Sequence, residues 1–210
     1  MKQIPTGPWR ENCYVVTNLQ NEVLIIDPGG EYQQIVNYIE SRHLKLLAIL
    51  GTHAHYDHIG EVSALKEYFS VPYYLHSKDK KLLRRANLYC KVFEGERPIS
   101  IPTVDRYLDE MGNTLSLGSF SIDVLWTPGH TPGGVFFYCE DCLFVGDLLG
   151  HHKIGRSDLP GGDQKALHSS LKQLGNFPRE TIIHPGHGSA CSIRDELENN
   201  PTLFEIINEG

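Results

Sequence analysis

Short apolar runs separated by polar turns recur along the chain and predict alternating strands and helices. Uninterrupted apolar runs of this length favour buried strands, and glycine or proline marks where several of them end. Helices are favoured over residues 31–44 and about 61–69, where apolar side chains recur at helical spacing. In the first half of the chain, we expect strands at residues 13–17, 23–27, 46–50 and 71–75.

The second half repeats this alternation in kind. One helix is expected from an N-cap at Asp163 to about Leu174, and a last helix begins after Ser192 with Asp195 at the capping-box position. Residues 91–106 are the least regular stretch and are expected to form a lid or a substrate-facing loop. Strands are expected near residue 115 and at 120–125, 135–138, 143–145 and 181–183.

Strands and helices occur in both halves of the chain without a linker, a sequence repeat or a composition shift between them. This organisation predicts an α/β protein in which two βα layers pack face to face. A length of 210 residues suffices for such a core. We therefore expect a single domain over residues 1–210, either as a monomer or as a homodimer.

Charge and composition narrow the classes of partner. The formal net charge is −7 and no basic stripe is present, which argues against a nucleic-acid partner or an anionic membrane surface. The first residues form no apolar signal core, and no stretch is long and apolar enough to span a membrane. We expect a soluble cytoplasmic protein that acts on a small molecule.

The five cysteines are an odd number and favour free thiols in a reducing compartment. The run Cys139-Glu140-Asp141-Cys142 is compatible with a redox pair or half of a zinc knuckle. Its apolar flanks instead favour two strands joined by a Glu140–Asp141 turn, with the two thiols facing each other across a hairpin.

Metal-binding side chains are concentrated in one short segment. The run His53-Ala54-His55-Tyr56-Asp57-His58 places three imidazoles and a carboxylate directly after the strand at 46–50 and the turn residues Gly51-Thr52. Leaving such groups unpaired is costly, and one bound divalent metal satisfies them together. Loops at strand ends are also where α/β folds place their chemistry.

Three further candidate ligands follow later strands, each beside glycine. They are His130, Asp147 and His187. Taken singly, each is explained by a hydrogen-bonded loop histidine or a capping aspartate, but a chance origin does not account for the whole set. Seven ligands suit two divalent ions with one bridging carboxylate. Because the set contains no thiolate, zinc, iron and manganese are all admissible, and zinc is our first expectation.

Such a centre would be hydrolytic. Water held between two divalent ions is deprotonated near neutral pH and becomes a nucleophile, while a metal polarises the attacked carbonyl. We expect Asp57 and Asp147 to be the catalytic carboxylates. The positive charge of the ions would draw an anionic substrate or stabilise an oxyanion.

The motif and the order of these residues resemble the metallo-β-lactamase superfamily over nearly the whole chain. The similarity extends from the strand at 12–14 and Ile26-Asp27-Pro28-Gly29 to Pro185-Gly186-His187-Gly188. The resemblance implies an αββα sandwich. It also disfavours antibiotic hydrolysis, because this chain has both Asp57 and His58 in a second full metal site, whereas many true β-lactamases lack that histidine. The resemblance further implies one ion on His53, His55 and His130, a second on Asp57, His58 and His187, and Asp147 as the bridge.

Within that superfamily, Gly146-Asp147 and the segment 154–163 are most similar to glyoxalase II-like hydrolases, which cleave thioesters such as hydroxyacylglutathione. A thiolate leaves without a proton donor, which suits a metal centre. Arg156 stands where that family commonly places a cation for the anionic part of the substrate, although a structural arginine is equally compatible. Only about twenty residues follow His187-Gly188, whereas full-length glyoxalase II has a C-terminal helical domain that helps bind glutathione.

The residues after the bridging aspartate depart from the family pattern. Thr-Leu-Phe is usual there, but this chain has Leu148-Leu149-Gly150 followed by His151-His152-Lys153. His151, His152 and Lys153 are candidates for substrate contact, and the two histidines are also candidates for hydrogen bonds to the metal ligands. A solvated position in the loop is the favoured alternative for both histidines, because histidine is usually found at the surface. Asp27 is a candidate hydrogen-bond acceptor for a ligand histidine, or otherwise a turn former before Pro28.

The main competing function is a mononuclear iron persulfide dioxygenase, with a metal face made of His53, His130 and Asp147. A lactonase and a phosphodiesterase of the same superfamily are further alternatives. Two zinc-like ions per chain favour the hydrolase, and one iron with oxygen uptake favours the dioxygenase.

Overall fold

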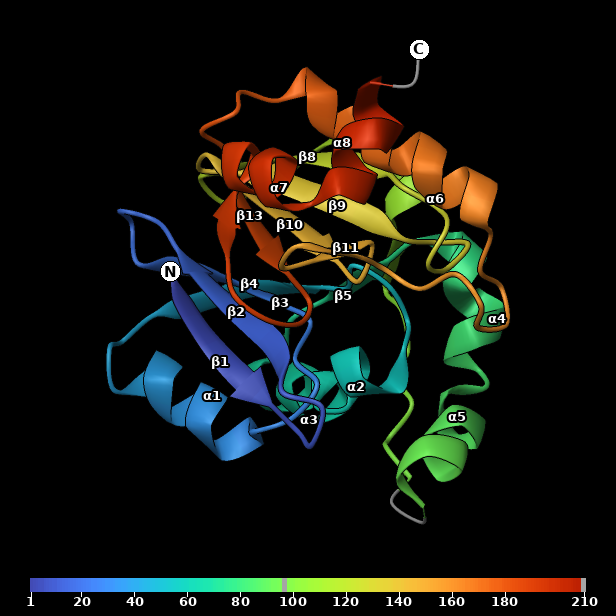
Figure 1. Cartoon of the computed structure of the whole chain (residues 1–210). Coiled ribbons are helices and arrows are strands. Elements are labelled where there is room, and N and C mark those ends of the chain that lie inside the picture. The colour runs from blue at the N-terminus through green and yellow to red at the C-terminus, as the bar shows by residue number, and fades with distance from the viewer. Residues whose placement is uncertain (96–97, 209–210) are drawn as a thin grey trace.

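Two β-sheets lie face to face in the computed structural model, with helices on both outer surfaces (Figure 1). The structure describes residues 1–95 and 98–208. The N-terminal sheet has the strand order β1-β2-β3-β4-β5-β6. Its strands are β1 (Lys2–Thr6), β2 (Glu11–Thr17), β3 (Glu22–Ile26), β4 (Lys45–Leu50), β5 (Tyr73–Leu75) and β6 (Arg106–Tyr107).

The C-terminal sheet has the order β14-β13-β10-β9-β8-β7, and β11 and β12 form a separate small hairpin. Its strands are β7 (Thr114–Leu117), β8 (Phe120–Trp126), β9 (Val135–Cys139), β10 (Cys142–Gly146), β13 (Ile182–Pro185) and β14 (Cys191–Ser192). The hairpin strands are β11 (Leu149–Gly150) and β12 (Lys153–Ile154).

Helices cover the outer face of each sheet. The helices α1 and α3 lie below the N-terminal sheet in Figure 1, and α6, α7 and α8 lie above the C-terminal sheet. The first half contains α1 (Tyr32–Glu40), α2 (Tyr56–Ile59), α3 (Val62–Phe69), α4 (Lys80–Leu83) and α5 (Ala86–Glu94). The second half contains α6 (Gln164–Leu171), α7 (Ile193–Asn199) and α8 (Pro201–Asn208).

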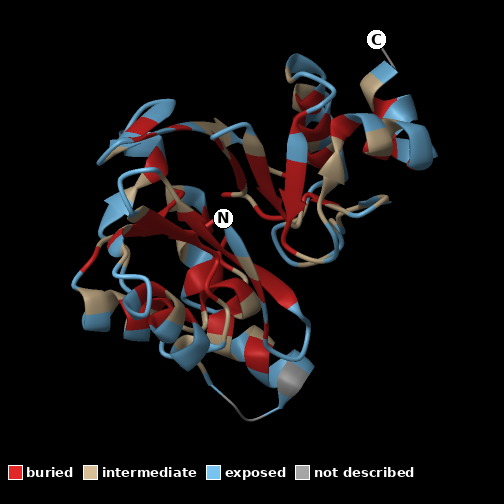
Figure 2. Cartoon of the chain, turned by 90° about the vertical axis from the view of Figure 1, so that its left-hand side faces the viewer, coloured by how far each residue is buried: buried red, intermediate tan, exposed pale blue. Residues whose placement is uncertain are grey.

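Three apolar clusters separate these layers, and Figure 2 shows the buried residues concentrated along the strands. One lies between the N-terminal sheet and its helices, one between the two sheets, and one between the C-terminal sheet and α6–α8. In β3, Val23 and Ile25 contribute to the first cluster, while Leu24 and Ile26 contribute to the second. Because both faces of this strand are buried, its sequence is an apolar run rather than an alternation. The predicted αββα sandwich is confirmed.

Parallel pairing gathers strand ends at one edge of the sandwich. In the N-terminal sheet β3, β4 and β5 are parallel, and in the C-terminal sheet β10 and β13 are parallel. The carboxyl ends of parallel neighbours meet at the same edge of a sheet, so the loops that follow them lie together. The histidine loop after β4 is one of these loops.

The elements that the pattern did not predict are mostly short edge strands. These are β1, β6, β14 and the hairpin β11–β12, which carry few consecutive apolar residues. Residues 91–94, expected in an irregular loop, instead complete α5, and residues 96 and 97 of that loop lie outside the described residues. The predicted Glu140–Asp141 turn is present, with positive φ angles of 50° and 58°, and Cys139 pairs with Cys142 across it as free thiols.

The helix predicted over 31–44 ends at Glu40, because the chain turns into a left-handed conformation at His43. None of the helices in the described part of the chain is long and apolar enough to cross a membrane.

Candidate metal centre

The seven predicted ligands converge from four strand ends. His53, His55, Asp57 and His58 follow β4, and His130 follows β8. Asp147 follows β10, and His187 follows β13. The candidates therefore come from both sheets and meet where the two sheets' loops face each other.

Three imidazoles form the first group. Nε2 of His53 lies 3.0 Å from Nδ1 of His55, which lies 2.9 Å from Nε2 of His130. One nitrogen from each ring lies within 4.8 Å of the other two. Three ring nitrogens that face one point are the donor arrangement of one side of a metal's coordination sphere.

Asp57, His58 and His187 form the second group, again with one ligand atom from each within 4.8 Å of the others. Oδ2 of Asp57 lies 3.4 Å from Nε2 of His187 and 4.0 Å from Nε2 of His58. One carboxylate and two imidazoles therefore face a second point.

Asp147 lies between the two groups. Its Oδ1 is 3.3 Å from Nε2 of His58, and its Oδ2 is 3.5 Å from Nε2 of His187. The same Oδ2 is 3.7 Å from Nε2 of His130, which belongs to the first group. A carboxylate in this position can contact ions held by either group.

Two buried atoms at the centre show that the donor set fits a metal. Nε2 of His58 and Oδ1 of Asp147 have no hydrogen-bond partner among the residues that the structure describes. Orphaned buried polar atoms are costly, and a cation between them removes that cost. Nitrogen and carboxylate donors without a thiolate suit zinc, iron or manganese.

Oxygen acceptors behind three of the rings set their orientation. Nδ1 of His130 lies 2.8 Å from the carbonyl oxygen of Arg156, and Nδ1 of His187 lies 3.1 Å from that of Trp9. Nδ1 of His58 lies 3.1 Å from Oδ2 of Asp27, the acceptor considered from the sequence. A carbonyl or carboxylate acceptor selects the tautomer with hydrogen on Nδ1, so Nε2 presents its lone pair to the centre.

The pKa directions agree with a ligand role for the first group. Burial, together with the neighbouring His130 ring, lowers the pKa of His55 to about 3. Burial and the nearby His58 also hold the pKa of His53 well below its usual value. These imidazoles are therefore neutral, as metal ligands must be.

The second group carries negative charge. Burial alone would raise the pKa of Asp147, but the facing His58 outweighs burial and lowers that pKa well below its usual value. Burial lowers the pKa of His58, but Asp147 and Asp57 outweigh it and raise that pKa well above the usual value. The negative charge of Asp147 and Asp57 beside His58 is of the kind that a bound cation offsets.

Two glycines allow the close approach of these loops. Gly146 has a φ of 51°, and a Cβ there would lie 2.5 Å from Oγ1 of Thr52. A Cβ at Gly186 would lie only 2.1 Å from Oδ1 of Asp147. Neither position has room for a side chain.

Buried polar residues that the sequence analysis missed hold the loops in place. Asp79 accepts hydrogen bonds from the N–H groups of Ala54 and Gly133 and from the Thr131 hydroxyl, and thereby joins the His53 loop to the His130 loop. The Asn12 amide donates to the backbone carbonyls of Pro185 and Gly188 on either side of His187. No local pattern marks these residues, because their partners are remote in sequence.

A hollow of about 170 Å³ opens directly over the metal centre. One wall is aromatic and apolar, and the floor contains candidate ligands from both groups. Its lining includes Trp9, Tyr56, Tyr89, Phe93, Leu159 and Pro160, together with Arg156.

Two of the four predicted substrate-binding residues border the centre. Arg156 lines this hollow and an adjacent one of about 210 Å³, and Lys153 lines the adjacent hollow. The exposed Arg156 guanidinium donates two hydrogen bonds of 2.8 Å to the Asp158 carboxylate. His151 and His152 instead lie beside Cys191 and Asp195, at the N-terminal end of α7. Substrate contact by any of the four stays a prediction.

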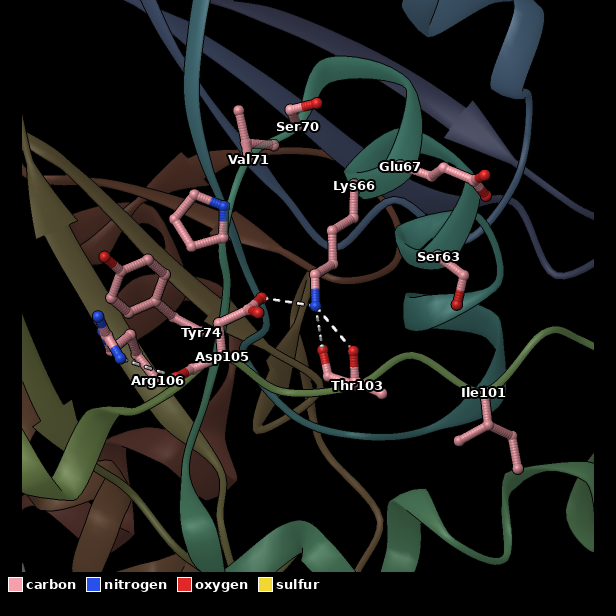
Figure 3. A pocket seen from close by; sticks show the side chains of 11 residues that line it. Ser63, Lys66, Glu67, Ser70, Val71, Tyr74, Ile101, Thr103, Asp105 and Arg106 are labelled. Carbon is pink, nitrogen blue, oxygen red and sulfur yellow. Dashed lines mark hydrogen bonds and ion pairs between the residues drawn. The ribbon is translucent and has the colours of Figure 1, made fainter.

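A larger hollow of about 690 Å³ lies away from the histidines, between α3 and β5–β6 (Figure 3). Of its two cations, Lys66 and Arg106, Lys66 is already paired, because its Nζ lies 2.7 Å from the Asp105 carboxylate and donates to Oγ1 and the carbonyl oxygen of Thr103. None of the seven candidate ligands lines it. Size alone therefore does not identify the reaction site.

A family model and similar proteins of known sequence point to the same superfamily. The profile of the metallo-beta-lactamase superfamily matches residues 6–187. Hydroxyacylglutathione hydrolase GloC of Haemophilus influenzae is 36% identical over 204 residues, which cover 95% of this chain and 96% of that protein.

Two solved structures are similar over almost their entire length. The crystal structure of BLEG-1 B3 metallo-beta-lactamase has a TM-score of 0.90 at 42% identity, and the match covers 96% of this chain and 98% of that one. TTHA1623 in a di-iron-bound form has a TM-score of 0.86 at 39% identity, with coverage of 96% and 100%. With its αββα sandwich and its histidine-rich loop at the edge of the sheets, this chain belongs to the metallo-beta-lactamase superfamily.

Proposed function

We propose that this chain is a dinuclear metal-dependent hydrolase that cleaves small acyl thioesters. The observation that carries the proposal is the convergence of seven donor side chains in two groups, with Asp147 within 3.7 Å of both. His53, His55 and His130 would hold one ion, Asp57, His58 and His187 the other, and Asp147 both. Zinc is our first expectation, and the di-iron form of the similar TTHA1623 makes iron the main alternative.

When bound there, divalent ions supply a water activated near neutral pH and polarise the carbonyl under attack. The protein's own contribution is to fix the donors before substrate arrives. Asp27 holds the His58 ring, and the backbone carbonyls of Trp9 and Arg156 hold the His187 and His130 rings. We assign Asp57 and Asp147 as the catalytic carboxylates, because both line the hollow together with the candidate ligands His55, His130 and His187.

The thioester assignment is supported by chemistry and by one relative. GloC of Haemophilus influenzae is named a hydroxyacylglutathione hydrolase. A thiol of pKa about 8.5 leaves as the thiolate, so the site needs no acid to protonate the leaving group, unlike a site for amide cleavage. The aromatic wall of the hollow offers apolar contact for the acyl or thiol part, with Trp9 and Phe93 at its rim.

Arg156 at this hollow and Lys153 at the adjacent one supply positive charge and suit a substrate with an anionic end. Because Asp158 already pairs with Arg156, binding of an anion competes with that exposed ion pair. We expect Arg156→Gln to raise KM for an anionic thioester by up to about fivefold, and Asp158→Asn to lower it, with little change for a neutral thioester. Equal KM shifts for both substrates would contradict this role.

The decisive experiment is a thioester panel on protein saturated with zinc, and separately with iron. We expect turnover by the wild type and by the control Asp123→Asn, an exposed carboxylate on β8 that accepts a hydrogen bond from Thr114. Asp57→Ala should lose about 10³-fold or more in kcat/KM, because it removes a donor and a charge at the centre. A wild-type rate no higher than that of Asp57→Ala on every thioester would overturn the proposal.

Further arms of the panel separate the related activities. A β-lactam is included because a similar structure is described as a B3 metallo-beta-lactamase, and an acyl lactone and a phosphodiester test the other hydrolases. One iron per chain with oxygen uptake on a persulfide would favour the dioxygenase instead. Metal analysis that finds two ions per chain, with thioester turnover, supports the hydrolase.

A further inference from the structure

A second cluster of metal-binding side chains lies outside the centre described above. His151 and His152 form the turn of the β11–β12 hairpin, Cys191 lies on β14, and Asp195 lies in the first turn of α7. One ligand atom from each of the four lies within 4.8 Å of the other three. Neither hollow at the metal centre is lined by any of them.

Direct contacts tie this cluster together. Nε2 of His152 lies 2.7 Å from Oδ2 of Asp195, and the backbone N–H of His152 donates to Oε1 of Glu196 at 2.7 Å. The Cys191 thiol donates to the same Glu196 oxygen at 3.2 Å. The His151 ring stacks on the His152 ring, with centroids 3.9 Å apart. The hairpin turn, β14 and α7 therefore meet through these side chains.

The backbone is specialised to present the two histidines. His152 has a φ of 54°, a left-handed conformation that costs a residue other than glycine about 1–3 kcal/mol. Adjacent histidines in extended structure would point to opposite faces, but in this tight turn their rings stack on the same side. The turn therefore brings one nitrogen of each ring close to Cys191 and Asp195.

The four donors match the preferences of a zinc-class ion. Two imidazoles, one thiol and one carboxylate make a four-coordinate set in which tetrahedral ligand atoms stand about 3.3–3.8 Å apart. The observed limit of 4.8 Å is wider than that range, and rotation of the exposed His151 side chain away from its stack on His152 would close it. Asp195, Glu196 and the Cys191 thiolate would offset the charge of the cation.

We propose that His151, His152, Cys191 and Asp195 bind a further zinc-class divalent ion that fastens the β11–β12 hairpin to α7. Binding forms a metal–sulfur bond and releases the Cys191 thiol proton to solvent, without oxidation or reduction. The hairpin also borders the loop after His187, since a Cβ at Gly188 would lie 3.5 Å from Cβ of His151. The ion would thus stabilise the hairpin beside the metal centre. Binding of this ion does not depend on whether the protein hydrolyses thioesters.

Cobalt distinguishes this site from the main centre. A thiolate bound to Co²⁺ gives a near-ultraviolet charge-transfer band, and the seven ligands of the main centre include no thiolate. We expect reduced wild-type protein, titrated with cobalt to saturation, to develop this band. Cys191→Ser should abolish the band and bind one fewer cobalt per chain. Cys142→Ser, which removes another partly buried thiol on β10, should retain both.

His151→Ala gives an independent test, because this exposed side chain is not needed for folding. The variant should weaken cobalt binding, measured through the same band, by about tenfold or more, while its circular dichroism stays that of the wild type. Absence of the band in saturated wild-type protein would overturn the proposal. A band that survives Cys191→Ser, or unchanged cobalt affinity in His151→Ala, would do so as well.

Discussion

Gly186→Ala tests whether the geometry of the metal centre depends on the missing side chain at this position. A Cβ there would lie 2.1 Å from Oδ1 of Asp147 and 2.7 Å from Cε1 of His58. Real Cβ contacts essentially never fall below 3.0 Å, so the Asp147 oxygen must retreat by at least 0.9 Å, the difference between 3.0 and 2.1 Å. The shift would move the carboxylate that lies between the two ligand groups.

The expected effect is large on function and moderate on stability. A displacement of about 1 Å at a reacting centre costs about 100-fold in rate, and disturbed ligand geometry costs about 10- to 100-fold in metal affinity. Overpacking costs about 1–3 kcal/mol, which is less than the usual stability of a domain, so the variant should still fold.

Zinc competition with a chromophoric chelator measures the affinity, and thioester kcat/KM measures the rate. Gly175→Ala is the matched control, because a Cβ there would meet only Cγ2 of Ile207 at 3.8 Å. We expect that control to keep wild-type zinc affinity and turnover. Wild-type values for both quantities in a folded Gly186→Ala protein would refute the reasoning.

Three further predictions concern the residues and ions that hold the centre. Asp27→Asn removes the charged acceptor behind His58 and should lower zinc affinity by about 10- to 100-fold in the same competition assay, and an unchanged affinity would contradict its orienting role. Asp79→Ala leaves three donors without an acceptor and should destabilise the metal-free protein by about 3 kcal/mol or more. Calorimetry should show this loss as a fall in Tm of at least about 6 °C. A fall in Tm below about 2 °C would contradict the role of Asp79 in joining the loops. Removing metal with a chelator should lower Tm by about 5–11 °C for each ion lost, relative to protein with free zinc at about 100 times Kd, and zinc should restore it. Equal Tm values would argue against a metal bound to the native state.

Much of the fold was predictable because the burial of its core strands is visible in their sequence. Strands β3, β4 and β9 are buried on both faces and are apolar apart from Glu22 and Lys45 at the first positions of β3 and β4, which made them visible as runs. The edge strands β1 and β14 pair on one side only and carry mixed residues, so no run marked them. Helix α5 was missed because its residues 91–94 belong to the stretch that was expected to form a loop, although apolar residues recur at helical spacing over Ala86–Glu94.

The donor residues of the candidate site could be predicted from the sequence, but the buried residues that hold its loops in place could not. The dense run of histidines and the strand-end positions of His130, Asp147 and His187 are local features. Asp79 carries no such mark, since its three donors come from loops that approach it only in the folded chain. The neighbouring residues in the sequence likewise do not determine whether His151 and His152 contact substrate. Their position depends on the folded chain, in which both rings lie near the N-terminal end of α7.

The sequence alone determined which donors the chain has, their order, and their placement where strands end in glycine-flanked loops. Those properties depend on local chemistry and on the backbone freedom of single residues. Only the tertiary structure decided which donors share a point in space, that Asp147 lies between two groups, and that Asp27 stands behind His58. These are distances between segments up to about 130 residues apart, and they depend on how two sheets pack on a common core rather than on any local pattern.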